Sequence, residues 1–365
     1  MQTFQQKLFS KINDLTPKEE EIFGRVYKVW SIKGFSIVPK ELRKWITSKF
    51  GSIEAVENQK FVKITNIITF EGAIFNELRT QRPIVEDTKL ADVMDIIGST
   101  QDANFAKPLL GTPSDTFGRI KGKHCITAAN LTKYDGMHSL IIFNDTNPLL
   151  FSRKRISDYF EVSQKWFNLA HKANKRAIYP LFTWNCLWRA GASIVNGHAQ
   201  VVLTEGQAYS KIEELRRLSM YYQESNKANY FDDVYMIHER LGLAFEKNGV
   251  RVLAKLTPIK EKEVAIFGTK FDKNLANVVS DVLNNMKETL GVKSFNLSVI
   301  LPPMEKTQES WRHIPILVRI VDRGLLSSRT TDIGAMELYA QSVVGSDPYV
   351  IVDNLKKALL EKKRR

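Results

Sequence analysis

One order of elements occurs twice along this chain, and it constrains the fold more than any other feature. Each copy consists of two apolar strands, an amphipathic helix and two further strands. The first copy is predicted at residues 123–128, 139–143, 156–170, 179–184 and 199–204. The second is predicted at residues 250–256, 263–267, 275–290, 295–301 and 314–320. This repetition predicts an α+β protein of two similar halves, each an antiparallel sheet with a helix packed on it.

Three domains are expected from these boundaries. Residues 1–55 are predicted as a small helical extension, because Thr16 and Glu19 have the spacing of a capping box and Gly51 ends a second amphipathic helix. Residues 56–240 form the first half and residues 241–365 the second, which ends in a helix.

The second half is expected to be a degenerate copy of the first. In an alignment that places His313 on His198, Pro315 stands where the first half has the hydrogen-bonding Gln200. An old duplication whose second copy has lost its chemistry accounts for this difference. Two unrelated α+β units with a chance histidine are the alternative.

Composition and charge limit the partners. The 365 residues include 53 Lys and Arg against 40 Asp and Glu, and this net charge of +13 attracts phosphate-bearing molecules. Hydrophobic residues make up 43% of the chain, which excludes disorder throughout. There is no apolar run of the ~20 residues that a spanning helix needs, no signal peptide, and only two cysteines. We therefore expect a cytoplasmic protein with no membrane partner, and the absence of nucleic-acid-binding motifs argues against nucleic acid as a partner.

A polar cluster around one histidine is the strongest chemical signal. On an extended segment Asn196, His198 and Gln200 point to the same side, just before an apolar strand. A neutral imidazole can attack phosphorus with one nitrogen while a backbone carbonyl holds the other, and amides can stabilise phosphoryl oxygens. Alternatively, His198 is an ordinary histidine at the edge of a strand.

The segment from Ser193 to Gln200 resembles the active-site motif of galactose-1-phosphate uridylyltransferases, and more loosely those of ADP-glucose phosphorylases and diadenosine polyphosphate phosphorylases. All of these belong to the histidine triad superfamily. Further matches occur along the chain in the order of the family. They are an Arg-x-x-Arg-Pro motif at Arg79, Arg82 and Pro83, a His-hydrophobic strand at residues 138–143 preceded by Asn130, Asn185 eight residues before the Ser, and a Gly-containing motif at residues 333–338.

The resemblance implies two histidine-triad-like halves and a role for each matched residue. His198 would be the catalytic nucleophile, with Gln200 and Ser193 as further catalytic residues that hold phosphoryl oxygens. The remaining matched residues would bind substrate, namely Arg79, Arg82, Asn130, Asn185 and Asn196.

The chain departs from the family pattern where the family binds zinc. The Cys-x-x-Cys pair is missing, and Asn147 and Asn196 stand near positions of metal ligands. We therefore expect no metal and no other cofactor. Gln200 is kept, which implies a transferase or phosphorylase, because hydrolytic branches commonly carry His there.

The function expected from these residues is a metal-independent nucleotidyltransferase or phosphorylase. A nucleoside diphosphate sugar or dinucleoside polyphosphate would donate a nucleotidyl group to His198, and phosphate or a sugar phosphate would accept it. A nonenzymatic phosphate- or nucleic-acid-binding protein on the same fold is the alternative. The sequence leaves the oligomeric state open, with a homodimer as one arrangement.

Overall fold

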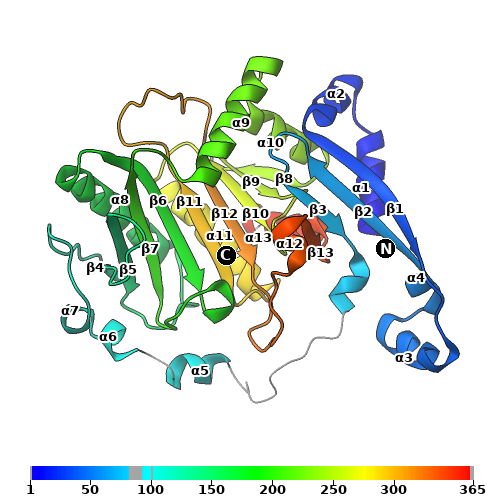
Figure 1. Ribbon diagram of the computed structural model, residues 1–365, viewed down its shortest axis with the longest axis horizontal. Coiled ribbons are helices and arrows are strands. Elements are labelled where there is room, and N and C mark those ends of the chain that lie inside the picture. Colours follow the sequence, from blue (N-terminus) through cyan, green and yellow to red (C-terminus); the bar gives the residue numbers. More distant parts are fainter. Residues whose placement is uncertain (1, 82–92, 100–101, 362–365) are drawn as a thin grey trace.

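The computed structural model describes residues 2–81, 93–99 and 102–361, which form two sheets (Figure 1). A nine-stranded sheet has the order β4-β5-β7-β6-β11-β12-β10-β9-β8, and a four-stranded sheet has the order β1-β2-β3-β13. All strand pairs of the larger sheet are antiparallel. The α+β class predicted from the sequence is thereby confirmed, although the two halves share one continuous sheet.

Each half contributes four strands in the same order. In the first half they are β4 (Cys125–Ala129), β5 (Met137–Phe143), β6 (Ala177–Cys186) and β7 (His198–Glu205). In the second half they are β9 (Val250–Ala254), β10 (Val264–Gly268), β11 (Phe295–Ile300) and β12 (Ile316–Asp322), with β8 (Ala244–Lys247) added at the edge. The halves join where β6 pairs with β11.

One row of paired residues crosses the whole sheet and fixes how the halves correspond. In the first half it runs through Ala128, Leu140, Gln200 and Thr183. Thr183 pairs with Ser298 across the junction, and the row continues through Arg319, Ala265 and Leu253. Ala128 and Leu253 are each the fourth residue of their strand. A pseudo-two-fold axis therefore passes through the pair Thr183–Ser298 and relates Gln200 to Arg319.

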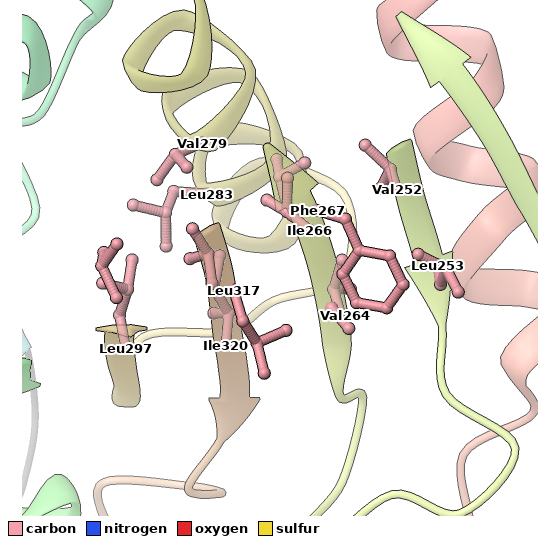
Figure 2. Close-up of a cluster of buried hydrophobic side chains, with 14 of the residues drawn as sticks. Val252, Leu253, Val264, Ile266, Phe267, Val279, Leu283, Leu297, Leu317 and Ile320 are labelled. Atoms are coloured by element: carbon pink, nitrogen blue, oxygen red, sulfur yellow. The ribbon is translucent and has the colours of Figure 1, made fainter. Parts of the chain in front are cut away.

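The core lies between the sheet and the helices α8 (Arg153–Ala173) and α11 (Lys273–Glu288). Apolar residues recur at helical spacing in both helices, so each presents one apolar face. In the second half Val279 and Leu283 of α11 lie over sheet residues that include Ile266 and Ile320 (Figure 2). The helices leave the opposite face of the nine-stranded sheet free for other segments; we call it the open face.

The N-terminal region corrects the prediction of a helical extension. It contains the two expected helices, α2 (Pro17–Val26) and α3 (Lys40–Phe50), and two that were not predicted, α1 (Phe4–Asn13) and α4 (Ile53–Glu57). Between them lies a nine-residue strand, β1 (Tyr27–Phe35), which pairs along its whole length with β2 (Asn58–Asn66). The alternation of apolar and polar residues in β1 is weak, since Trp30 and Ile32 are exposed, and this hid the strand from sequence analysis.

The remaining elements complete the two sheets and connect them. The four-stranded sheet also contains β3 (Gly72–Phe75) and β13 (Ser342–Val344), and it lies beside the second half (Figure 1). The short helical turns are η1 (Glu77–Gln81), α5 (Val93–Ser99), α6 (Ala103–Ala106), α7 (Pro108–Gly111), η2 (Trp188–Ala190) and α12 (Ala335–Tyr339). The longer helices are α9 (Ser210–Asn226), α10 (Tyr230–Arg240) and α13 (Pro348–Leu359).

Candidate active site

His198 is the first residue of β7, and its side chain is buried on the open face of the first half. Its Nδ1 lies 2.8 Å from the carbonyl oxygen of Asn196. Because a carbonyl can only accept, Nδ1 carries the proton and the lone pair is on Nε2. Burial lowers the pKa of His198, while the bond to Asn196 partly opposes this. The imidazole is therefore neutral at pH 7, with one nitrogen oriented by the backbone and the other available as a nucleophile.

Gln200 is held by two neighbours on the same face. Its Oε1 accepts a hydrogen bond from the Tyr134 hydroxyl at 2.5 Å and lies 2.9 Å from Nε2 of His138. The backbone N–H of Tyr134 donates to Nδ1 of His138, which makes Nε2 of His138 the donor toward Gln200. Because its Oε1 already accepts two hydrogen bonds, Gln200 has its Nε2 amide group left as a hydrogen-bond donor.

Asn130 is close to this group at the end of β4. Its Oδ1 accepts from the backbone N–H of Thr132. Its Nδ2 lies 3.1 Å from Nε2 of His138 but forms no hydrogen bond with it, because both groups are donors in this tautomer. The Lys133 ammonium donates to the carbonyl of His138 at 2.6 Å. The loop between β4 and β5 is therefore attached to the strand that carries Gln200 through a buried histidine, His138.

An apolar floor lies beside the polar group on the same open face. It is formed by Ile126, Ala128, Leu140 and Ile142, and Phe105 packs against it. The ring of Phe105 also meets the ring of His198 edge-on, with centroids 5.3 Å apart.

The segment that carries Phe105 is held over the floor by Asn196. The amide of Asn196 accepts from the backbone N–H of Asp102 at 2.7 Å and donates to the carbonyl of Asp102 at 3.3 Å. Asn196, predicted to bind substrate, thus has both ends of its side chain engaged by the segment that covers the site.

Asn185 lies on β6 at the junction of the halves. Its Oδ1 accepts from Nδ2 of Asn296 on β11 at 2.7 Å, which leaves its own Nδ2 as a donor. The Arg323 guanidinium donates to Asn296 and forms a two-point ion pair with Asp332. Ser193, in the loop before β7, is exposed.

The predicted arginine pair is not brought to His198 by any contact in the described chain. Arg79 lies in η1, beside the four-stranded sheet, where its backbone N–H donates to Asn76 and its side chain is exposed. Arg82 lies outside the described residues. Their proposed role in binding phosphate stays a prediction.

The open face of the second half is filled by an ion-pair cluster. Arg319, the counterpart of Gln200, donates to Glu263 at 2.6 Å and to Glu71, in the turn between β2 and β3, at 2.7 Å. Lys255 donates to Glu71 at 3.0 Å. Burial alone raises the pKa of Glu71, but the positive charges of Arg319 and Lys255 outweigh it and lower the pKa to about 2.

The alignment of His313 with His198 is wrong. Because Arg319 is equivalent to Gln200 in the row of paired residues, Leu317 is equivalent to His198. His313 lies before the first residue of β12. The Pro315 that was aligned with Gln200 shifts with it, and Arg319 takes that place. His313 instead lines a pocket of about 460 Å³ with residues that include Arg251 and Phe267, and its Nε2 lies 2.8 Å from Nε2 of Gln223.

Metal-ligating side chains are scattered in the described ranges, where no three His, Cys, Asp or Glu residues cluster as a metal site would require. Cys125 is buried beside Asp158, and burial together with that carboxylate raises the pKa of its thiol. None of the described helices is long and apolar enough to cross a membrane.

Comparison with known proteins identifies the fold. No protein-family model matches the chain, and no curated protein matches it by sequence. An ADP-glucose phosphorylase from Arabidopsis thaliana, solved with bound ADP-glucose, matches with a TM-score of 0.60 and 14% identity, over 80% of this chain and 97% of that one. The chain shares the fold of this phosphorylase.

Two further solved structures agree with this fold. A uridylyltransferase matches with a TM-score of 0.56 and 12% identity, over 83% of this chain and 100% of that one. A galactose-1-phosphate uridylyltransferase-like protein from Arabidopsis thaliana matches with a TM-score of 0.58 and 13% identity, over 72% and 93%. The resemblance seen in the sequence motifs is thereby confirmed for the fold.

Three residues of this site were missing from the sequence prediction. His138 was noticed only as the start of a strand, yet it holds Gln200. Tyr134 and Phe105 carried no signal, because their contacts depend on strand pairing and on a covering segment. A signal that could have drawn His138 into this polar group is that His138, His198 and Gln200 are polar residues on strands that are otherwise apolar.

Proposed function

We propose that this chain is a nucleotidyltransferase or phosphorylase that acts through a covalent nucleotidyl intermediate on His198. The observation that carries the proposal is the Nδ1 contact with the Asn196 carbonyl. It fixes the tautomer with a free Nε2 lone pair, and it can stabilise the positive charge that develops on the ring during attack. The match to an enzyme solved with ADP-glucose supports a nucleotide sugar as the donor.

The reaction would proceed in two displacements. Nε2 of His198 attacks the α-phosphorus of the donor, a nitrogen–phosphorus bond forms, and the bond to the bridging oxygen breaks, so that a sugar phosphate or a nucleotide leaves with that oxygen. An oxygen of phosphate or of a sugar phosphate then attacks the same phosphorus and returns the electron pair to Nε2. The donor amide of Gln200 would stabilise the phosphoryl oxygens in both steps.

The surrounding residues suggest how the nucleotide would be placed. The apolar floor under Phe105 suits a base, since flat apolar walls with few polar groups are typical of such sites. Asn185 offers a donor to the ribose or sugar, and Asn130, Ser193, Arg79 and Arg82 are the further expected contacts. In the described residues no three metal-ligating side chains cluster, which supports a reaction without zinc, because a catalytic zinc needs about three clustered protein ligands.

A turnover assay tests the proposal. The protein would be incubated with inorganic phosphate and, in turn, ADP-glucose, UDP-glucose or diadenosine tetraphosphate, and the nucleotide products separated by anion exchange. We expect phosphorolysis of at least one donor, and a loss of at least about 10³-fold in His198→Asn. His313→Asn is the matched control and should retain turnover within about twofold. Binding of donors without turnover by the native protein would contradict the proposal and favour the nonenzymatic alternative.

A further inference from the structure

The outer end of the N-terminal sheet carries an unusual surface, which we call the basic tip and define as residues 33–50. It comprises the end of β1, the connection that follows and α3, and it lies at the edge of the molecule farthest from the first half (Figure 1). Four large apolar side chains are exposed there: Phe35 by 76%, Ile37 by 92%, Leu42 by 47% and Trp45 by 50%. Such a concentration of exposed apolar area marks an interaction surface.

Basic residues surround these apolar side chains. The tip contains Lys33, Lys40, Arg43, Lys44 and Lys49, all exposed, against one acidic residue, Glu41. In the described part of the chain none of the five forms an ion pair with a carboxylate. Elsewhere basic residues commonly find such partners, as Arg319 and Arg323 do. The tip is therefore a local concentration of uncompensated positive charge.

Buried side chains and hydrogen bonds to residues 56–57, rather than the exposed side chains, hold the tip in shape. Ile46 and Val38 are buried, the backbone N–H of Val38 donates to Glu57 at 2.9 Å, and Ser36 bonds to the backbone of Glu57 and of Val56. Apart from the edge-on contact of Trp45 with Phe50, with ring centroids 5.9 Å apart, the exposed side chains contribute little to the local fold. They are available to a partner without any unfolding of the tip.

We propose that the basic tip docks on the surface of an anionic lipid bilayer. Aliphatic and aromatic side chains would enter the boundary between headgroups and acyl chains, while the lysines and Arg43 meet the anionic headgroups. The expectation of no membrane partner rested on the lack of a spanning segment, and docking on a bilayer surface needs none, so the proposal replaces that expectation. A nucleic acid would match the positive charge but offers little apolar surface for Ile37 and Leu42 to contact. A second copy of the chain would bring like positive charges together.

Vesicle sedimentation tests the proposal. The full-length protein would be mixed with vesicles of phosphatidylcholine containing 30% phosphatidylserine, with pure phosphatidylcholine vesicles as comparison. We expect binding to the anionic vesicles that weakens in 0.5 M NaCl. Lys40→Glu/Lys44→Glu should lower the partition coefficient by at least about 30-fold, as expected for two charges near an anionic surface. Lys172→Glu/Lys175→Glu, which makes the same charge change on exposed residues at the far end of α8, should change it little.

Two further measurements separate insertion from adsorption and from other partners. Brominated lipids should quench tryptophan fluorescence in the native protein and quench it less in Trp45→Phe, and Ile37→Ser should weaken binding without lowering the melting temperature. Equal binding to both vesicle types would overturn the proposal. Binding to polyuridylate but not to vesicles would also overturn it in favour of nucleic acid, as would self-association that is abolished by Ile37→Ser, in favour of a second copy.

Discussion

The open faces of the two halves use the same frame for opposite purposes. In the first half the face carries His198 and Gln200, and neither has an acidic partner among the described residues. In the second half Leu317 and Arg319 stand at those positions, and the β2–β3 turn reaches the face through Glu71. One face keeps polar groups available for a ligand, whereas the other uses them to attach the N-terminal sheet.

The difference also agrees with the expectation that the second half is a copy without chemistry that has kept its fold. Each half buries apolar residues between its sheet and its helix, so the core does not depend on what the open face carries. With an arginine at the position of the glutamine, this face forms ion pairs with the N-terminal region. We infer that the second half is a degenerate copy whose open face now has a structural role.

Removal of Arg319 should give the largest effect on stability. In Arg319→Ala the carboxylate of Glu263, which is fully buried, and that of Glu71 lose their main partner. Breaking a buried pair from one side typically costs about 3–5 kcal/mol, so we expect a decrease of about 3 kcal/mol in the free energy of unfolding. Urea denaturation followed by circular dichroism would measure it. A decrease below about 1 kcal/mol would mean that the cluster does not attach the N-terminal sheet.

The matched change in the first half is Gln200→Ala, at the same position of the row. It removes one hydrogen-bond donor to the transferring phosphoryl group, and such losses typically lower kcat by about 10²–10³-fold. Because Gln200 is only partly buried, we expect a stability change within about 1 kcal/mol. Steady-state kinetics with the donor found in the turnover assay, together with urea denaturation, would measure both. A variant that is strongly destabilised but fully active would reverse our assignment of roles to the two faces.

A smaller effect is expected from pH. Burial lowers the pKa of His198 below the ordinary value near 6.5, so its imidazole stays neutral and nucleophilic down to that pH. The plot of kcat/KM against pH should therefore be flat from pH 8 to about 6.5. It should fall about tenfold per pH unit only below the lowered pKa. An acid limb with its midpoint above 7 would show that another group controls the reaction.

The sequence predicted those parts of the molecule that depend on local pattern. Apolar periodicity predicted the helices α8 and α11 and every strand of the nine-stranded sheet except β8. His198 and Gln200 follow from residues two positions apart on one strand. The contact between His138 and Gln200 joins residues 62 positions apart, and that between Arg319 and Glu71 joins residues 248 positions apart. Both depend on strand register, which a single sequence does not specify.

Errors in the sequence prediction have equally specific causes. The alignment of His313 with His198 matched residue types, whereas strand pairing shows that the two connections before β7 and β12 differ. Strand β1 was missed because its apolar residues do not all lie on one buried face. Trp30, Ile32 and Phe35 are exposed, so the strand lacks a regular alternation of apolar and polar residues. The covering role of Phe105 could not be predicted, since it comes from a segment without periodicity.

Covalent labelling of His198 tests the central claim most directly. The protein would be incubated with a donor labelled at the α-phosphorus, with the acceptor omitted, and quenched rapidly in alkali. We predict an adduct on His198 that is stable in alkali and labile in acid, that discharges when phosphate or a sugar phosphate is added, and that is absent in His198→Asn but present in His313→Asn. Turnover of the same donor without any adduct on His198 at the earliest quench times would contradict the account.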